Sequence, residues 1–205
     1  MICSFLSVYC PFLSSKFSGE DAIGKVNLRS TVTGYYLRKF LDTNINLSAQ
    51  TITSTYHYFP VIRLADIYLL YAEAMNEAYG PNDAADLGWT ALEALNKVRT
   101  RAGITVPYTT TSQTEMTKKI RNERRVELAF EDQRYFDLRR WKTAEKDLNQ
   151  PLMGFRIERQ DNGVVSTHEF VVDGQRKFNT KMYYSPIPYS EMQLNTNLVQ
   201  NPGWR

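Results

Sequence analysis

Residues 61–80 read "VIRLADIYLLYAEAMNEAYG", and this stretch decides the fold class. Its apolar side chains recur every three or four residues, the spacing at which residues share one face of an α-helix. Pro60 precedes the periodic stretch and Gly80-Pro81 follows it, and both are typical of helix boundaries. The sequence therefore predicts an amphipathic helix with apolar positions at Leu64, Ile67, Tyr68, Tyr71, Ala74, Met75 and Ala78.

Three further helices are predicted after this one. Residues 84–103 repeat the apolar pattern and end at Gly103, a residue suited to the left-handed position that closes a helix. Ser112 and Glu115 have the spacing of a capping box and begin the third helix. A fourth is expected from about 134 to 148. We interpret the four as two antiparallel hairpins similar to tetratricopeptide (TPR) repeats.

The chain on either side of this helical core, about 61–148, has a different pattern. Residues 1–55 are broken by Gly, Asn, Asp and Thr, which predicts irregular structure or short strands. After Pro151, apolar and polar residues alternate around Asn162-Gly163, which predicts a β-hairpin with a two-residue turn.

Pro186-x-Pro188 follows the predicted hairpin, and a short helix is expected from Ser190 with Glu191 in its first turn. The predicted fold class is mostly α with irregular and short β segments: TPR-like helical hairpins, then a C-terminal β-hairpin and loop region.

Composition narrows the class of function. The 25 Lys and Arg against 22 Asp and Glu give a net charge of only +3, which is too small to indicate nucleic-acid binding. Cys3 and Cys10 lie close together near the start, too few for a disulfide framework and without His at metal-ligand spacing. The first cation is Lys16 and Tyr9 directly precedes Cys10, so we expect residues 1–17 to be neither a signal peptide nor a lipidation signal.

The densest charge cluster is residues 122–141, "NERRVELAFEDQRYFDLRRW", with five arginines and five carboxylates. Its zero net charge argues against phosphate binding. The arginines beside Glu123 and Glu127 are expected to lower the carboxylate pKa, which opposes a general acid. We interpret the cluster as an ion-pair network joining the third and fourth helices, with Phe130, Phe136 and Trp141 between them. Its expected members, with Asp66 as a further one, are Arg63, Glu73, Glu123, Arg124, Glu127, Arg134, Asp137 and Arg140.

No Ser/His/Asp set, phosphate-binding loop or metal-ligand cluster is present in the sequence. We therefore expect a chain without catalytic activity and without a cofactor. His57 and His168 are the only two histidines and neither lies in a known motif.

Four stretches carry a resemblance to a known family: residues 59–77, 91–104, 120–141 ("IRNERRVELAFEDQRYFDLRRW") and 183–204 ("YYSPIPYSEMQLNTNLVQNPGW"). In order and spacing they resemble the C-terminal portion of the SusD/RagB family. Residues 33–42, "TGYYLRKFLD", fit the segment expected before them.

That resemblance implies an outer-membrane lipoprotein on the cell-surface side, from Bacteroidetes-type bacteria. It also implies binding of a nutrient, mostly a glycan or oligosaccharide, for a SusC-like TonB-dependent transporter partner. Full-length members are twice this size or more, and their lipid anchor lies at an N-terminus missing here. We thus expect 1–17 to be an unmatched segment and 18–205 to be the C-terminal part of a SusD/RagB-like domain, with a tail at about 151–205.

The sugar-contacting aromatics of the family come largely from the missing part, so ligand-binding candidates rest on the residues themselves. A sugar site needs an exposed aromatic ring beside hydrogen-bonding groups. Trp89, Tyr79 with Asn82, and Tyr56 with Tyr58 fit this description, although each ring is more often packed in a core. Tyr183 and Tyr184 are expected in a strand that buries one of them.

Two alternatives stay open from the residues alone. A stand-alone, soluble TPR-like interaction module would explain the lack of an export signal, as would an inactive truncated remnant. A glycoside hydrolase fragment is disfavoured by the arginines around its carboxylates. If part of the domain is missing, an exposed apolar patch should make the chain self-associate.

Overall fold

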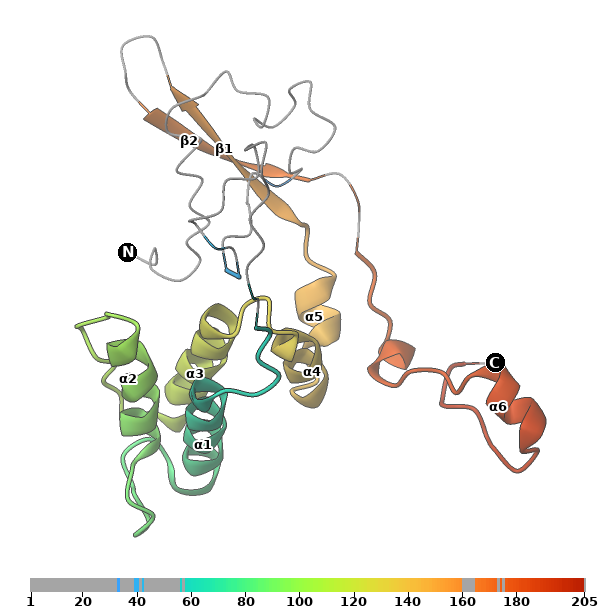
Figure 1. Cartoon of the computed structure of the whole chain (residues 1–205), viewed down its shortest axis with the longest axis horizontal. Helices are drawn as coiled ribbons and strands as arrows, with labels where there is room; N and C mark the ends of the chain where they lie inside the picture. Colours follow the sequence, from blue (N-terminus) through green and yellow to red (C-terminus); the bar gives the residue numbers. More distant parts are fainter. Residues whose placement is uncertain are drawn as a thin grey trace. The chain divides into compact units, whose positions relative to one another are not determined.

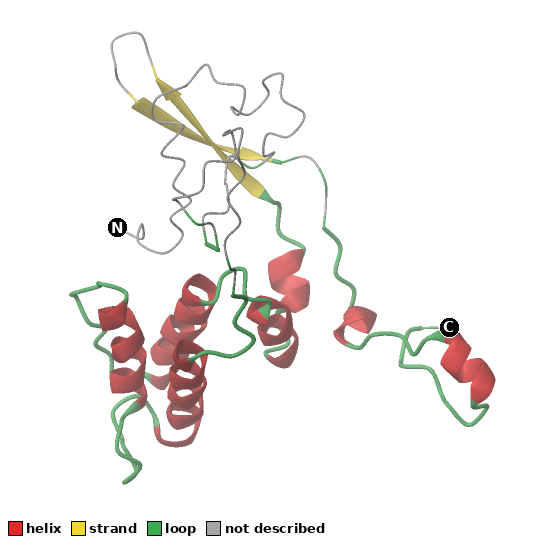
Figure 2. Ribbon diagram, viewed as in Figure 1, coloured by secondary structure: helices red, strands yellow, loops and turns green. Residues whose placement is uncertain are grey.

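A computed structural model describes residues 58–159, 165–172, 174 and 176–204, together with Thr33, Lys39, Phe40, Asp42 and Tyr56. The chain divides into two compact units. Among the described residues, the first unit lies within 36–134, and the second lies within 135–205 and includes Thr33. The predicted fold class, mostly helical with a C-terminal β-hairpin, is confirmed (Figures 1 and 2).

The first unit contains three helices, α1 (Leu64–Tyr79), α2 (Ala91–Arg101) and α3 (Gln113–Glu127). Helix α1 packs against both α2 and α3. Their shared core is made of small and medium apolar side chains, among which Leu69, Leu95, Met116 and Ile120 are almost completely buried. The third helix thus completes a three-helix cluster, whereas the sequence pattern predicts that it pairs with the fourth helix.

Local signals explain where these helices begin and end. The Thr90 hydroxyl and the Glu93 carboxylate form a reciprocal capping box at the start of α2. At its end, Ile104 donates to the Arg99 carbonyl at 3.0 Å and Gly103 donates to that of Thr100 at 2.9 Å, a Schellman motif with Gly103 at φ +80°. The predicted role of Gly103 is confirmed.

The second unit begins within the first turn of α4 (Gln133–Arg140), which is followed by α5 (Ala144–Leu148). The expected helix 134–148 is therefore interrupted. Thr143 donates to the Leu138 carbonyl at 3.0 Å and Lys142 to that of Arg139 at 3.1 Å, which is a second Schellman motif. Lys142 takes the left-handed position with φ +55°. Glycine is usual there, so a lysine does not indicate a helix end.

A two-stranded antiparallel sheet follows, β1 (Met153–Arg159) and β2 (Val165–Val171). Its register pairs Arg159 with Val165. The predicted hairpin is therefore present, and the sequence predicts its turn at Asn162-Gly163. The turn residues themselves lie outside the described residues.

The tail contains a short 3-10 helix, η1 (Thr180–Tyr183), and α6 (Tyr189–Leu194). The short helix expected from Ser190 is confirmed, but the strand expected at Tyr183 and Tyr184 is wrong. Side chains near the end close this tail on itself. The Gln200 amide both accepts from and donates to the Ile187 backbone, at 2.8 and 2.9 Å, and Asn201 donates to the Ser185 carbonyl at 2.7 Å.

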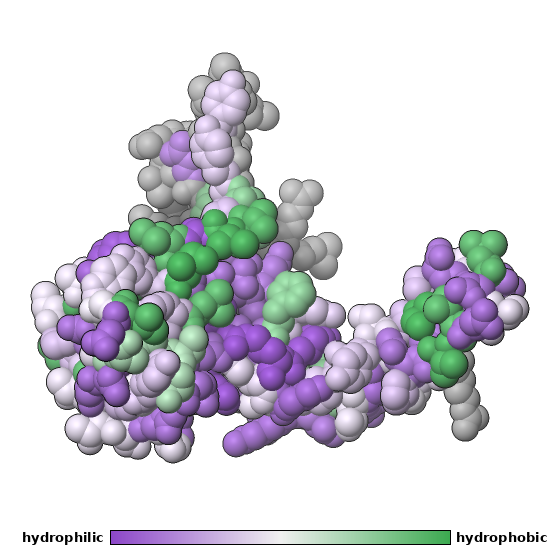
Figure 3. Space-filling model, turned by 90° about the horizontal axis from the view of Figure 1, so that it is seen from below, coloured by the Kyte–Doolittle hydropathy of each residue, from purple (hydrophilic) through white to green (hydrophobic). Residues whose placement is uncertain are grey.

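Helix α1 has a second apolar face in addition to the one that meets α2 and α3. Leu64 and Ile67 are 66% and 51% exposed, and Val61 and Ile62, just before the helix, are also exposed. Figure 3 shows hydrophobic residues, in green, gathered on the surface of the helical part of the chain. An exposed apolar face of this kind favours association.

Replacing both Leu64 and Ile67 with glutamine is expected to reduce self-association of the chain at least tenfold, because it removes apolar area that association buries. Light scattering over a concentration series and binding of a hydrophobic dye measure this. Leu194→Gln, an 83% exposed position in the other unit, is the matched control. A monodisperse wild-type monomer that binds no dye would contradict the prediction.

Candidate functional site

The connection between α1 and α2, residues 80–90, carries two of the candidate ligand-binding residues, Asn82 and Trp89. Its backbone is held by side chains of α1 and of the next loop. The Tyr71 hydroxyl donates to the Trp89 carbonyl at 2.8 Å, and the Asn82 amide donates to the Thr110 carbonyl at 3.0 Å. Asp83 accepts from the Ala85 backbone at 2.8 Å. Trp89 therefore projects from an ordered loop.

The Trp89 ring lies close to two other side chains. Its centroid is 5.3 Å from that of Tyr68 on α1, and the Lys97 ammonium on α2 lies 4.1 Å from it. Trp89 is 39% exposed. The group therefore combines an accessible aromatic surface with a hydrogen-bond donor, the two elements a sugar site needs.

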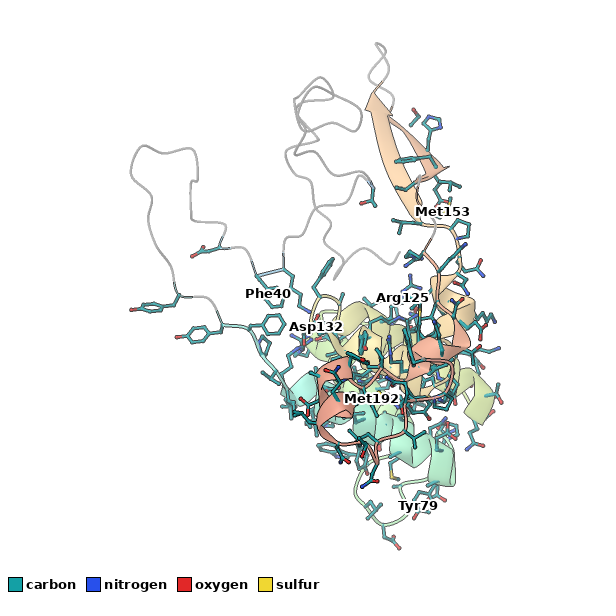
Figure 4. All side chains as sticks on the ribbon, turned by 90° about the vertical axis from the view of Figure 1, so that its right-hand side faces the viewer. Phe40, Tyr79, Arg125, Asp132, Met153 and Met192 are labelled. Atoms are coloured by element: carbon teal, nitrogen blue, oxygen red, sulfur yellow. The ribbon has the colours of Figure 1, made fainter. Side chains whose placement is uncertain are left out.

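The other candidates do not join this group. Tyr79 is 51% exposed at the C-terminal end of α1 (Figure 4), and the Asn82 amide nitrogen is already used by Thr110. Tyr56 and Tyr58 are almost fully exposed and precede the N-terminus of α1. Because a helix rises 1.5 Å per residue, roughly 20 Å of α1 separates them from Tyr79. The five candidates thus belong to different places.

Tyr68 and Lys97 were not singled out in the sequence. Tyr68 was assigned to the apolar face of its helix, and Lys97 is an ordinary exposed lysine. Their contact with Trp89 joins α1, the loop and α2, so no spacing within one helix predicts it.

Ion pairs fix the arrangement of the helices that carry this group. Arg124 of α3 contacts Asp66 of α1 at 2.8 Å, and both side chains are buried. Arg99 of α2 contacts Glu123 of α3 at 3.1 Å. These pairs connect α3 to α1 and α2, which differs from the expected link between α3 and α4.

A second set of contacts surrounds Glu127 and Glu131, just after α3. Arg63 donates to both carboxylates, at 2.6 and 2.7 Å, and Arg101 contacts Glu127 at 2.6 Å. Lys39 contacts Glu131 and also donates to the Glu127 and Ala129 carbonyls. The set therefore binds the segment before α1 to the end of α3.

The remaining members of the expected network are placed as follows. Asp137 contacts Arg140 at 2.9 Å within α4. Glu73 lies on α1, partly buried, and Arg134 lies in the first turn of α4. Phe130 and Phe136 are 55% and 61% exposed.

Glu123 and Glu131, two of the buried carboxylates of α3 and the turn after it, differ in acidity. Burial raises the pKa of Glu123, and the hydrogen bond from Arg99 offsets this only in part. Burial acts in the same direction on Glu131, but hydrogen bonds from Arg63 and Lys39 outweigh it and lower its pKa. The expectation that flanking arginines lower the pKa of Glu123 is therefore wrong, because Arg124 turns to Asp66 and burial dominates.

The turn after α3 holds Glu131 between two residues in the left-handed region, Phe130 at φ +63° and Asp132 at φ +61° (Asp132 is labelled in Figure 4). A side chain makes this conformation costly, and glycine relieves the cost. Phe130→Gly is therefore expected to be about 1 kcal/mol more stable than Phe130→Ala.

Phe136 is the matched control for this prediction, because it is equally exposed but lies inside α4. There the order should reverse, with Phe136→Gly about 1 kcal/mol less stable than Phe136→Ala. Chemical denaturation of the four variants measures both differences. The same order at the two positions would contradict the assignment.

Two further properties concern the described residues only. They contain no group of three or more His, Cys, Asp or Glu side chains arranged to hold a metal ion. None of their helices has the length and apolar composition needed to cross a bilayer.

Comparison with known proteins decides the family. The model of the SusD family matches residues 14–204, nearly the whole chain. The chain belongs to the SusD family. Members of this family are binding proteins without catalytic activity, in agreement with the expectation from the sequence.

Individual SusD-like proteins extend this match. SusD-like protein P25 of Formosa agariphila is 29% identical over 98% of this chain, and SusD-like protein P2 of the same organism is 31% identical over 74%. The crystal structure of a SusD-like protein from Bacteroides fragilis superposes with a TM-score of 0.69 at 31% identity over 85% of this chain.

This SusD-family chain is much shorter than those relatives. It spans 36% of protein P25, 26% of protein P2 and 32% of the B. fragilis chain. The comparisons therefore establish the family and the SusD-like fold of the part that is present.

Proposed function

We propose that this chain acts in a non-catalytic protein that binds a glycan or another nutrient for uptake across the outer membrane. The single observation that carries the proposal is the SusD-family match over residues 14–204. The sequence resemblance in four separate stretches supports the same assignment.

The proposed setting is the cell surface, with a SusC-like TonB-dependent transporter as partner and a lipid anchor attaching the whole protein to the outer membrane. Only about a third of the relatives' length is matched. The transporter contact and the anchor are therefore proposed for the whole protein.

Within this chain, the group around Trp89 is the proposed glycan contact in the helical unit. The apolar face of a pyranose ring can stack on the indole, while the Lys97 ammonium donates to sugar hydroxyls. The loop that carries Trp89 is held by Tyr71 and Asn82, so ring placement needs little ordering on binding.

A glycan array probed with the fluorescently labelled chain tests this function. Binding of at least one oligosaccharide class is expected, and Trp89→Ala should weaken it about tenfold, equivalent to about 1.4 kcal/mol. Phe136→Ala removes an exposed ring of the second unit and should leave binding unchanged. An array without signal would count against glycan binding. A signal that Trp89→Ala does not change would support glycan binding but show that the site is not at Trp89.

A protein-docking module is the second candidate, favoured by the exposed apolar face of α1 at Leu64 and Ile67. A helix of a partner protein fits such a face. Under this alternative, the Leu64→Gln and Ile67→Gln changes abolish binding of the partner protein, and the chain binds no saccharide on the glycan array.

A further inference from the structure

A set of aromatic and cationic side chains lies on the second unit. It combines Lys142, at the end of α4, with Tyr183, Tyr184, Trp204 and Lys181 of the tail. The Lys142 ammonium lies 4.5 Å from the centroid of the Tyr183 ring and 4.9 Å from that of Tyr184. The Lys181 ammonium lies 4.3 Å from the centroid of Trp204.

Hydrogen bonds join these side chains into one surface. The Trp204 indole N–H donates to the carbonyls of Lys181 and Tyr184, at 3.0 and 2.9 Å. The Tyr183 hydroxyl accepts from the backbone N–H of Glu145 at 3.3 Å. The rings are therefore held in place, while Tyr184 remains 58% exposed and both lysines are exposed.

The backbone takes uncommon conformations at two points of this surface. Lys142 occupies the left-handed region at φ +55°, a conformation that costs a non-glycine residue energy. Gly203 has φ +83°, and a Cβ added there would come within 2.8 Å of the Lys181 Cβ. A glycine at 203 thus allows Lys181 to pass close to the chain and reach the Trp204 ring.

The surface carries the ammonium groups of Lys142 and Lys181 beside the rings. The Glu145 carboxylate, on the neighbouring helix α5, accepts from the Thr180 hydroxyl at 3.2 Å. Aromatic faces suit the apolar face of a sugar, whereas ammonium groups suit carboxylate or sulfate substituents. Neutral sugars would use only the aromatic faces and not the ammonium groups.

We propose that Lys142, Tyr184, Trp204 and Lys181 form a binding surface for an acidic oligosaccharide, one that carries carboxylate or sulfate groups. The proposal rests on the proposed function and adds the substrate class. Tyr184 and Trp204 contact sugar faces, the two ammonium groups pair with the anionic substituents, and Tyr183 positions Lys142 and Tyr184.

Calorimetric titration of the 205-residue chain with hexagalacturonate and with chondroitin sulfate hexasaccharide tests the proposal. Methyl-esterified hexagalacturonate, which keeps the sugar backbone but lacks the charge, and maltohexaose are the neutral probes. At least one acidic probe is expected to bind at least tenfold tighter than both neutral probes, with an affinity that falls as salt is added.

Variants then locate the site. The double change Lys142→Met and Lys181→Met should remove the preference for acidic probes and the salt dependence, while Tyr184→Ala should weaken binding of the acidic probes. Lys146→Met and Tyr189→Ala, an exposed lysine and an exposed tyrosine of the same unit, should change neither. Thermal melting of each variant confirms that it folds.

The outcomes separate the two proposals. The proposed surface for acidic oligosaccharides is wrong if the neutral probes bind more tightly, or if the double lysine variant binds the acidic probes as well as wild type does. Either result leaves the proposed glycan binding in place. No binding of any of the four probes overturns the acidic surface, and a silent glycan array in addition overturns the proposed function.

Discussion

Replacing Arg124 with methionine is expected to lower the free energy of unfolding by about 3–5 kcal/mol. Its guanidinium contacts Asp66 at 2.8 Å, and the two side chains are only 2% and 6% exposed. Methionine keeps much of the volume but leaves the Asp66 carboxylate buried without this partner. Urea denaturation followed by circular dichroism measures the loss.

Two controls make this result specific. Arg125→Met removes an exposed arginine from the next position of the same helix (Figure 4) and should change stability by less than about 0.5 kcal/mol. Combining Arg124→Met with Asp66→Leu replaces the pair by apolar side chains and should recover most of the loss. A double variant that is as unstable as the sum of both single variants would show that the pair has no special role.

Glu131→Gln is expected to lower the free energy of unfolding by about 2 kcal/mol at pH 7, because Arg63 and Lys39 bind the ionised carboxylate. Glu123→Gln should be nearly neutral. Burial raises the pKa of Glu123 in the folded chain, so the desolvation cost of its charge offsets much of what the contact with Arg99 contributes.

The same two residues predict opposite dependences on pH. Glu131 has a lowered pKa, so its contribution is present above its ordinary pKa, about 4.5, and is lost as the pH falls through the lower folded value. Glu123 has a raised pKa, so its contribution becomes more favourable as the pH falls through the raised folded value towards about 4.5.

Denaturation between pH 7 and pH 3 checks this pair of expectations. The difference in free energy of unfolding between wild type and Glu131→Gln should shrink as the pH falls. Over the same range, wild type should become more stable relative to Glu123→Gln. If the stability difference from wild type had the same sign and the same pH dependence for both variants, the opposite pKa shifts assigned to Glu131 and Glu123 would be contradicted.

Local sequence signals were enough for much of the fold. The periodicity of 61–80 predicts α1, and Gly103 predicts the end of α2 because glycine reaches the left-handed region without strain. The helix after Pro188 follows from the same kind of signal. Each of these depends on interactions within a few residues.

Features that depend on contacts between elements could not be predicted in this way. Lys142 follows α4 in the left-handed conformation, which the conformational preferences of lysine do not predict. The Glu123 and Glu127 carboxylates were expected to meet α4, but they bind arginines of α2 and of the segment before α1. Which partner a charged helix residue meets depends on the packing of the apolar faces, and here α3 packs on α1 and α2.

The candidate site illustrates the same limit. Trp89 was chosen for its residue type and its loop, but Tyr68 and Lys97 join it only in the folded unit. Tyr183 and Tyr184 were noted for their position in a presumed strand. The 3-10 helix and the contact with Lys142 place them differently.

The most direct test of the central claim is purification of the whole protein that carries this chain from the outer membrane of its native host. The proposed function predicts that it fractionates with the outer membrane and brings down a TonB-dependent transporter in a fixed ratio. Recovery in the soluble fraction, without a transporter and without bound saccharide, would contradict the account.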